Sequence, residues 1–181
     1  ELWVLFLEKA YAKLHGGYYA LRGGFASEGL MDLTGCPADE FPFEDEEIAK
    51  QIEDGSLFDK ILDWDQRGFL MCCSTPGEYK FSEKTRPGEA GGLVPGHAYT
   101  LLSAAKMNSG DRLLRIRNPW GSFEWDGDWS DADARWTDDA KAEIAAATGL
   151  AVSEVIVEND GTFWMPYEAF VTNFVKVAVC Y

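Results

Sequence analysis

Hydrophobic residues recur along the chain at two different spacings, which predict helices in some segments and strands in others. Apolar residues at helical spacing in residues 2–14 predict an amphipathic helix, which Gly16 and Gly17 would end. Thr137 is a typical N-cap, and Pro166 can open a short helix. Helices are therefore expected over residues 2–14, within 43–64 with an interruption at Gly55, between Thr137 and Gly149, and over 167–174.

Two apolar runs joined by a turn predict an antiparallel hairpin. Residues 97–103 are mainly apolar, and residues 112–117 alternate apolar with charged side chains. The sequence Met-Asn-Ser-Gly-Asp between them, residues 107–111, is typical of a turn. Further strands are expected over 69–74 and 175–179, and a long loop over 74–95. The pattern indicates a mixed α+β fold, sheet-dominated in its middle and end, with helices at the edges.

Composition adds constraints on the partners of the chain. The 181 residues are 46% hydrophobic and carry a formal net charge of −15. Such a charge argues against nucleic-acid binding, which needs Lys and Arg to neutralise phosphates, and permits cationic partners such as Ca²⁺. No apolar run reaches the roughly 18 residues of a membrane span, and the first residues do not resemble a signal peptide.

The cysteines favour a reducing environment. Cys72 and Cys73 are adjacent and cannot readily bridge each other, and no Cys-x-x-Cys pair suggests zinc. We therefore expect an intracellular, cytoplasmic protein whose four cysteines, including Cys36 and Cys180, stay reduced.

The predicted hairpin brings a histidine and an asparagine together. His97 begins the first strand between the small residues Gly96 and Ala98, and Asn118 follows the second strand. Antiparallel pairing places His97 opposite a position close to Asn118, where side chains meet. An amide oxygen beside an imidazole can fix its tautomer, as a Cys-His-Asn protease requires, and Trp120 could shield their hydrogen bond. On geometry alone, a hairpin with polar ends and a core tryptophan explains these residues equally well.

Five segments carry a resemblance to the calpain protease core. GHAYTLL at residues 96–102 resembles the calpain stretch that holds the triad histidine, and LLRIRNPWGSFEWDGDWSD at 113–131 resembles the one that holds the asparagine. DGTFWMPYEAF at 160–170 resembles the closing segment of the same subdomain. ELWVLFLEKAYAKLHGGYYAL at 1–21 and GGFASEGLMDLTG at 23–35 resemble the helix and the crossover before it.

This resemblance implies a papain-like cysteine protease fold with two subdomains across a cleft. Residues 1–25 would be the last helix of the first subdomain with the crossover. Residues 26–181 would be the second subdomain, an antiparallel sheet or barrel with flanking helices. His97 would be the general base and acid, Asn118 its orienting partner and Trp120 their shield.

The nucleophile of the family is missing. In calpains it lies on a helix of the first subdomain, within a Gln-Gly-x-x-Gly-x-Cys-Trp pattern that this chain does not contain. The four cysteines present are therefore expected to be structural, and an upstream subdomain is expected to supply the thiol. The implied function is a calcium-dependent cysteine endopeptidase that cleaves polypeptides, with this chain alone inactive.

An acidic segment suggests a cation site. Five acids crowd into ten residues, and their repulsion costs free energy unless they are solvated or bind a cation. They are Glu124, Asp126, Asp128, Asp131 and Asp133. Their spacing is not that of an EF-hand, and an ordinary solvated loop is the alternative.

The calpain resemblance implies particular Ca²⁺ ligands. Glu124, Asp131 and Asp160, with the backbone carbonyl of Glu158, match ligands of the site in the second subdomain. Glu1 matches a ligand of the site in the first subdomain. Thr162 stands where the family commonly has another acid, which removes one carboxylate.

Two other functions fit parts of the sequence. A catalytically inactive calpain-like scaffold could bind calcium or protein partners, although His97, Asn118 and Trp120 are all present, which argues against lost chemistry. A carbohydrate- or peptide-binding module could use the seven tryptophans, although packing against a sheet explains most of them.

Overall fold

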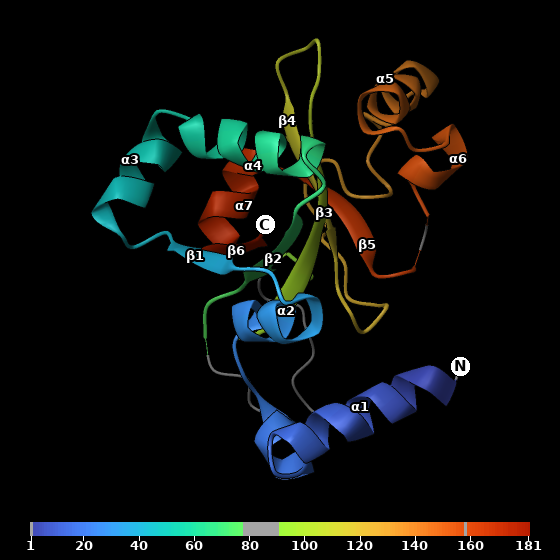
Figure 1. Cartoon of the computed structure of the whole chain (residues 1–181). Coiled ribbons are helices and arrows are strands. Elements are labelled where there is room, and N and C mark those ends of the chain that lie inside the picture. Colours follow the sequence, from blue (N-terminus) through green and yellow to red (C-terminus); the bar gives the residue numbers. More distant parts are fainter. Residues whose placement is uncertain (1, 78–90, 158) are drawn as a thin grey trace.

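A computed structural model describes residues 2–77, 91–157 and 159–181 of the chain (Figure 1). In chain order, the helices and strands of these residues are α1 (Leu2–Leu14), the 3-10 helix η1 (Tyr18–Arg22), α2 (Ala26–Thr34), β1 (Ala38–Pro42), α3 (Glu46–Glu53), α4 (Ser56–Gln66), β2 (Leu70–Ser74), β3 (Ala98–Lys106), β4 (Arg112–Arg117), α5 (Asp138–Thr148), α6 (Val152–Val155), β5 (Thr162–Pro166), α7 (Tyr167–Asn173) and β6 (Lys176–Cys180).

The strands form one antiparallel sheet in the order β1-β6-β2-β3-β4-β5. The hairpin predicted around residues 107–111 is present as β3 and β4, with a register shift between Leu101 and Ser103. The predicted α+β class, with a mainly antiparallel sheet and flanking helices, is confirmed.

Helices cover both faces of this sheet, because successive side chains of a strand point to opposite sides. Leu114 belongs to a core formed with α3, α4 and α7, whereas its neighbour Leu113 belongs to a core formed with α5 and α6. Trp164 of β5 lies in the second core, and its indole N–H donates to the Val155 carbonyl at 2.8 Å. In Figure 1, α4 and α7 accordingly lie apart from α5 and α6.

Local signals set the helix ends where the sequence predicted them. The Thr137 hydroxyl accepts a hydrogen bond from the Ala140 N–H at 3.2 Å and caps α5, which ends at Gly149 in a left-handed conformation. Gly55 separates α3 from α4, and α1 ends at Leu14 before the glycine pair.

Three elements differ from the sequence prediction. Residues 23–35, which were expected to be the crossover between the subdomains, contain the helix α2, with Gly29 inside it. Strand β1 was not predicted, and it pairs along its whole length with β6. Strand β5 was not predicted either, and it forms the edge beside β4. The loop expected over 74–95 lies mostly outside the described residues.

His15 has a structural role, although its partner is a side chain. Its Nε2 lies 3.2 Å from the Asp32 carboxylate of α2, which also accepts a hydrogen bond from the Tyr11 hydroxyl at 2.8 Å. These contacts link α1 to α2.

Helix α1 exposes a broad apolar surface. Leu2, Leu5 and Phe6 are 72%, 59% and 69% exposed, and α1 extends away from the sheet in Figure 1. Within the described ranges, no helix has the length and apolar character needed to cross a bilayer.

The two-sided core predicts a clear difference between two leucines. Leu114→Ala removes a fully buried side chain of β4 and should lower the free energy of unfolding by about 2–5 kcal/mol. Leu33→Ala in α2 changes a side chain that is 61% exposed and should lower it by less than about 0.5 kcal/mol. Urea unfolding of the two variants measures the difference, and equal losses would contradict the assigned core.

Candidate active site

The site lies at the open end of the β3–β4 hairpin, away from its turn. His97 immediately precedes β3, and Asn118 immediately follows β4. Thr100 pairs with Arg117, and continuing this register places His97 opposite position 120, two residues beyond Asn118. Asn118 is 0% exposed and continues the buried face of Leu114 and Ile116.

The two side chains are hydrogen bonded, as the sequence predicted. Nε2 of His97 lies 2.9 Å from Oδ1 of Asn118. The same Oδ1 accepts a hydrogen bond from the backbone N–H of Trp120 at 3.0 Å, and Nδ2 donates to the Phe123 carbonyl at 3.2 Å. Both ends of the amide are thus bound to main-chain groups of one loop.

These contacts determine where His97 carries its proton. A backbone N–H can only donate and a carbonyl can only accept, so the orientation of the Asn118 amide is fixed by Trp120 and Phe123. Because Oδ1 is an acceptor, Nε2 of His97 must be the donor. The neutral imidazole therefore has its lone pair on Nδ1, the nitrogen that faces away from Asn118, and this nitrogen can accept a proton.

Burial and hydrogen bonding act in opposite directions on the pKa of His97. Burial lowers it from the ordinary value of 6.5, and the hydrogen bond to Asn118 raises it in part. The net direction is downward, so the ring is neutral near pH 7 and available as a base.

Two aromatic residues cover the histidine. The Trp120 ring centroid lies 4.4 Å from that of His97 at a tilt of 43°, and Trp120 is 47% exposed. The Tyr99 ring packs edge-on against His97, with the ring centroids 5.0 Å apart. The Trp120 ring thus lies against the His97 ring, and the shielding of the His97–Asn118 hydrogen bond stays a prediction.

A tight turn supports the asparagine from behind. The N–H of Asn118 donates to the Gly161 carbonyl at 2.8 Å. Gly161 has φ +85°, and a Cβ there would lie 2.7 Å from the Asn118 carbonyl oxygen. Only glycine fits this approach, because both the backbone conformation and the space exclude a side chain. Phe123, whose carbonyl receives the amide, also has a positive φ, of 63°.

The two adjacent cysteines are poorly suited to act as nucleophiles. Cys72 and Cys73 lie in the central strand β2, and burial raises the pKa of both thiols. Cys180 is buried in β6. Cys36 is exposed between α2 and β1, and its backbone carbonyl accepts a 3.8 Å contact from the Cys180 thiol. Buried thiols with a raised pKa are inert, which agrees with the structural role predicted for Cys72 and Cys73.

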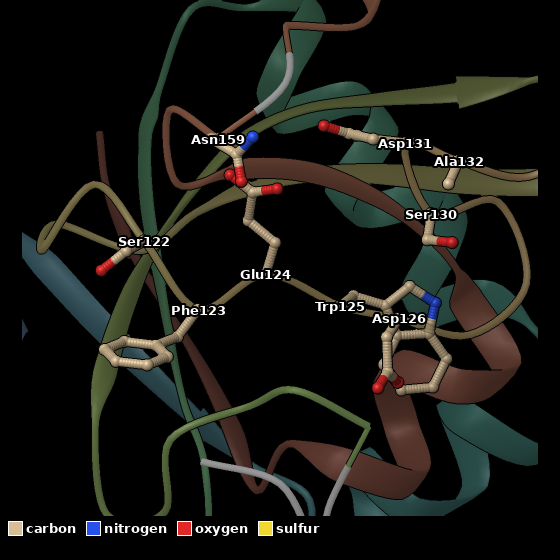
Figure 2. A pocket seen from close by; sticks show the side chains of 9 residues that line it. All are labelled: Ser122, Phe123, Glu124, Trp125, Asp126, Ser130, Asp131, Ala132 and Asn159. Carbon is tan, nitrogen blue, oxygen red and sulfur yellow. The ribbon is translucent and has the colours of Figure 1, made fainter. Parts of the chain in front are cut away.

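Three of the predicted metal ligands, Glu124, Asp131 and Asp160, lie in two neighbouring loops. A pocket of about 530 Å³ is lined by Glu124, Asp126, Asp131 and Asn159, among others. Figure 2 shows the Glu124 side chain extending toward Asn159, whereas Asp126 lies at the other end beside Trp125.

The Glu124 carboxylate accepts a hydrogen bond from the Gly161 N–H at 2.6 Å, and Asp160 accepts one from the Thr162 N–H at 2.6 Å. Each acid keeps a second oxygen for another partner. These oxygen donors suit Ca²⁺ chemically.

The described side chains do not by themselves assemble a metal centre. Among them, no group of three or more His, Cys, Asp or Glu residues could hold a metal ion. The other two ligands predicted from the resemblance, Glu1 and the Glu158 carbonyl, lie outside the described residues. The calcium site remains a prediction that rests on the acidic donors near the pocket.

Comparison with known proteins identifies the family. A family model described as "Calpain family cysteine protease" matches residues 1–181. The chain belongs to the calpain family. This calpain-family chain is 37% identical to "Calpain-type cysteine protease DEK1" of Arabidopsis thaliana, and the match covers 99% of the chain and 8% of that protein. It is 39% identical to "Calpain-9" of Rattus norvegicus, over 99% of the chain and 24% of that protein.

The chain therefore spans at most about a quarter of these two relatives. Human "Calpain-14" is 36% identical over 98% of the chain and 23% of its own length. The predicted membership of the calpain family of cysteine proteases is confirmed.

Sequence reasoning missed some groups of this calpain-family site. The Phe123 carbonyl fixes the amide, but a backbone carbonyl leaves no signal in the side-chain sequence. Gly161 could have been found, because a glycine between Asp160 and Thr162 next to a predicted ligand indicates a tight turn.

The pKa of His97 can be measured because the chain contains only two histidines. NMR titration should give a His97 midpoint below 6.5, and Asn118→Ala should lower it further by removing the contact that raises it. The unfolded chain then binds the proton more tightly than the folded chain does. The contribution of neutral His97 to the free energy of unfolding is fully present above a pH of about 6.5 and declines as the pH falls below that value. His15→Gln assigns the signals, and a midpoint above 6.5 in the unmodified chain would contradict the burial.

Proposed function

We propose that this chain supplies the general base and its orienting amide to a calcium-dependent, papain-like cysteine endopeptidase. The observation that carries the proposal is the hydrogen bond from His97 to Asn118, which leaves Nδ1 unprotonated. The buried Asn118 amide is hydrogen bonded at both ends to backbone groups, so it can hold the His97 ring in one orientation.

The chemistry follows from the position of the lone pair. Nδ1 of His97 takes the proton from a cysteine thiol of an upstream subdomain, and the imidazolium stabilises the resulting thiolate. The thiolate attacks the carbonyl carbon of a peptide bond, and His97 returns the proton to the leaving amine. In the second half, His97 takes a proton from water, whose oxygen attacks the acyl carbon, and the carbon–sulfur bond breaks to release the thiolate beside the imidazolium.

Asn118 and Trp120 support the histidine in different ways. Asn118 keeps the ring oriented while its charge changes, because the hydrogen bond from Nε2 persists in both protonation states. Trp120 covers this hydrogen bond and lowers the access of water, which strengthens it.

The proposal also divides the chain between two protease subdomains. We assign residues 1–25 to the end of the first subdomain and residues 26–181 to the second. The exposed apolar residues of α1 support this boundary, since an apolar surface of this extent usually meets another part of a protein. The first subdomain would cover α1 and bring its cysteine to His97.

Calcium is part of the proposal through Glu124, Asp131 and Asp160, with the Glu158 carbonyl in the same site and Glu1 in a second. Bound Ca²⁺ would link the loop after Asn118 to the loop around Asp160. The loss of a carboxylate at Thr162 favours weak binding, with a Kd on the order of 10⁻⁴ M or higher. Four reduced cysteines support an intracellular, cytoplasmic location.

Activity assays test the base. In the full-length protein that contains this chain, His97→Ala should reduce kcat on an unfolded protein substrate by roughly 10³-fold. His15→Ala removes the other histidine, on the surface, and should leave kcat within about twofold. The 181-residue chain alone should not cleave, because it lacks the nucleophile.

Three outcomes would contradict this proposal. Full activity of His97→Ala would remove the base from His97. Activity of the isolated chain that disappears on mutation of any of its four cysteines would show that the nucleophile was misassigned. An inactive full-length protein with an intact fold would favour the scaffold function.

Titration calorimetry tests calcium separately. The chain should bind Ca²⁺ weakly, and Asp131→Ala should abolish the heat because it removes one of three carboxylate ligands. Asp63→Ala is the control: it removes the same charge from the exposed surface of α4 and should leave the heat unchanged. Equal heats for both variants, or no heat at millimolar Ca²⁺, would identify the acidic loop as solvated surface.

A further inference from the structure

A second group of hydrogen bonds holds the backbone that carries His97. Thr75 follows β2 and is only 7% exposed. Its backbone N–H donates to the His97 carbonyl at 3.0 Å, and its hydroxyl oxygen accepts from the His97 N–H at 3.0 Å. One residue thus binds both main-chain groups of the histidine.

The Thr75 hydroxyl replaces a bond of the sheet. Cys73 pairs with Tyr99 and Ser74 with Ala98, so the next pair in this register is Thr75 with His97. In a regular antiparallel pair of this type, the His97 N–H would donate to the Thr75 carbonyl. Here it donates to the side chain instead, and the register continues through the hydroxyl.

The same hydroxyl also reaches the turn before the histidine. Its proton points to the Val94 carbonyl at 2.7 Å, with the His97 carbonyl at 3.2 Å as a weaker alternative. Between Val94 and His97 the chain turns at Gly96, whose φ is +60° and whose N–H donates to the Pro76 carbonyl at 2.8 Å. Thr75 therefore binds both ends of this turn.

Tyr99 binds the turn from the other side. Its hydroxyl accepts a hydrogen bond from the Val94 N–H at 2.8 Å, and its ring packs edge-on against His97. Tyr99 is 1% exposed, so this bond is dry and costly to lose. Between them, the two hydroxyls bind the N–H and the carbonyl of Val94 and the N–H of His97.

We infer that Thr75 and Tyr99 are positioning residues that set the place of His97 along the cleft, as Asn118 sets its orientation. This inference rests on the proposed function of His97. The amide of Asn118 fixes the far side of the ring, but it does not fix the main chain from which the side chain extends. Without Thr75, the His97 N–H and the Val94 carbonyl lose buried partners, and the turn can shift.

A substitution that removes the hydroxyl and keeps nearly the same side-chain volume tests the positioning role of Thr75. In the full-length protein, Thr75→Val should reduce kcat by roughly 10- to 100-fold, with KM changed less than about threefold, because a displaced base acts on the chemical step. Thr75→Ser keeps the hydroxyl and should retain kcat within about threefold. Titration with a thiol-directed covalent inhibitor counts the folded active sites, so that loss of folded protein does not count as loss of rate.

A tyrosine pair provides the second, independent measurement. Tyr99→Phe should reduce kcat by roughly fivefold or more, because the Val94 N–H loses its acceptor. Tyr167→Phe is the matched control: Tyr167 is also 1% exposed, and its hydroxyl has no hydrogen-bond partner among the described residues. Its kcat should stay within about twofold.

The outcomes separate this inference from the function on which it rests. If Thr75→Val and Thr75→Ser lose kcat equally per active site, or Tyr99→Phe behaves like Tyr167→Phe, the positioning role is wrong while an inactive His97→Ala still supports the protease. If His97→Ala keeps its activity, both the proposed function and the role of Thr75 are wrong.

Discussion

The arrangement depends on the hydrogen bond from the Trp120 N–H to Oδ1 of Asn118. This donor cannot reverse its role, so it makes the oxygen an acceptor and thereby assigns the proton of His97 to Nε2. The Phe123 carbonyl adds the same constraint at Nδ2. The basicity of Nδ1 is therefore determined by the backbone of one short loop, which a side-chain rotation cannot undo.

The fold serves to keep this loop in place. Asn118 follows strand β4, which lies between two cores. Leu113 packs toward α5 and α6, and Ile116 packs toward α4 and α7. A side chain anchored by a strand that is buried on both faces has little freedom, which is the condition for a well-defined site. Thr75 and the register of β2 with β3 extend the same support to the backbone of His97.

Much of this arrangement could be predicted from the sequence, because local signals produce it. The turn at 107–111 and the alternation of 112–117 fix the hairpin, and the hairpin brings His97 to Asn118. The parts that could not be predicted depend on distant partners. Helix α2 forms despite Gly29 because it packs on β1 and β6, and β1, which ends at Pro42, exists as a strand because β6 pairs with it. The calcium ligands depend on how two loops approach, which charge spacing alone does not determine.

The most direct test of this account is the tautomer of the His97 ring. Long-range ¹H–¹⁵N correlation spectra of the chain above its pKa distinguish a protonated ring nitrogen from one that carries a lone pair. In the unmodified chain Nε2 should be protonated and Nδ1 should not, and Asn118→Ala should allow the two forms to mix. A proton on Nδ1 in the unmodified chain would contradict it, because His97 could then neither donate to Asn118 nor accept the proton of a thiol at Nδ1.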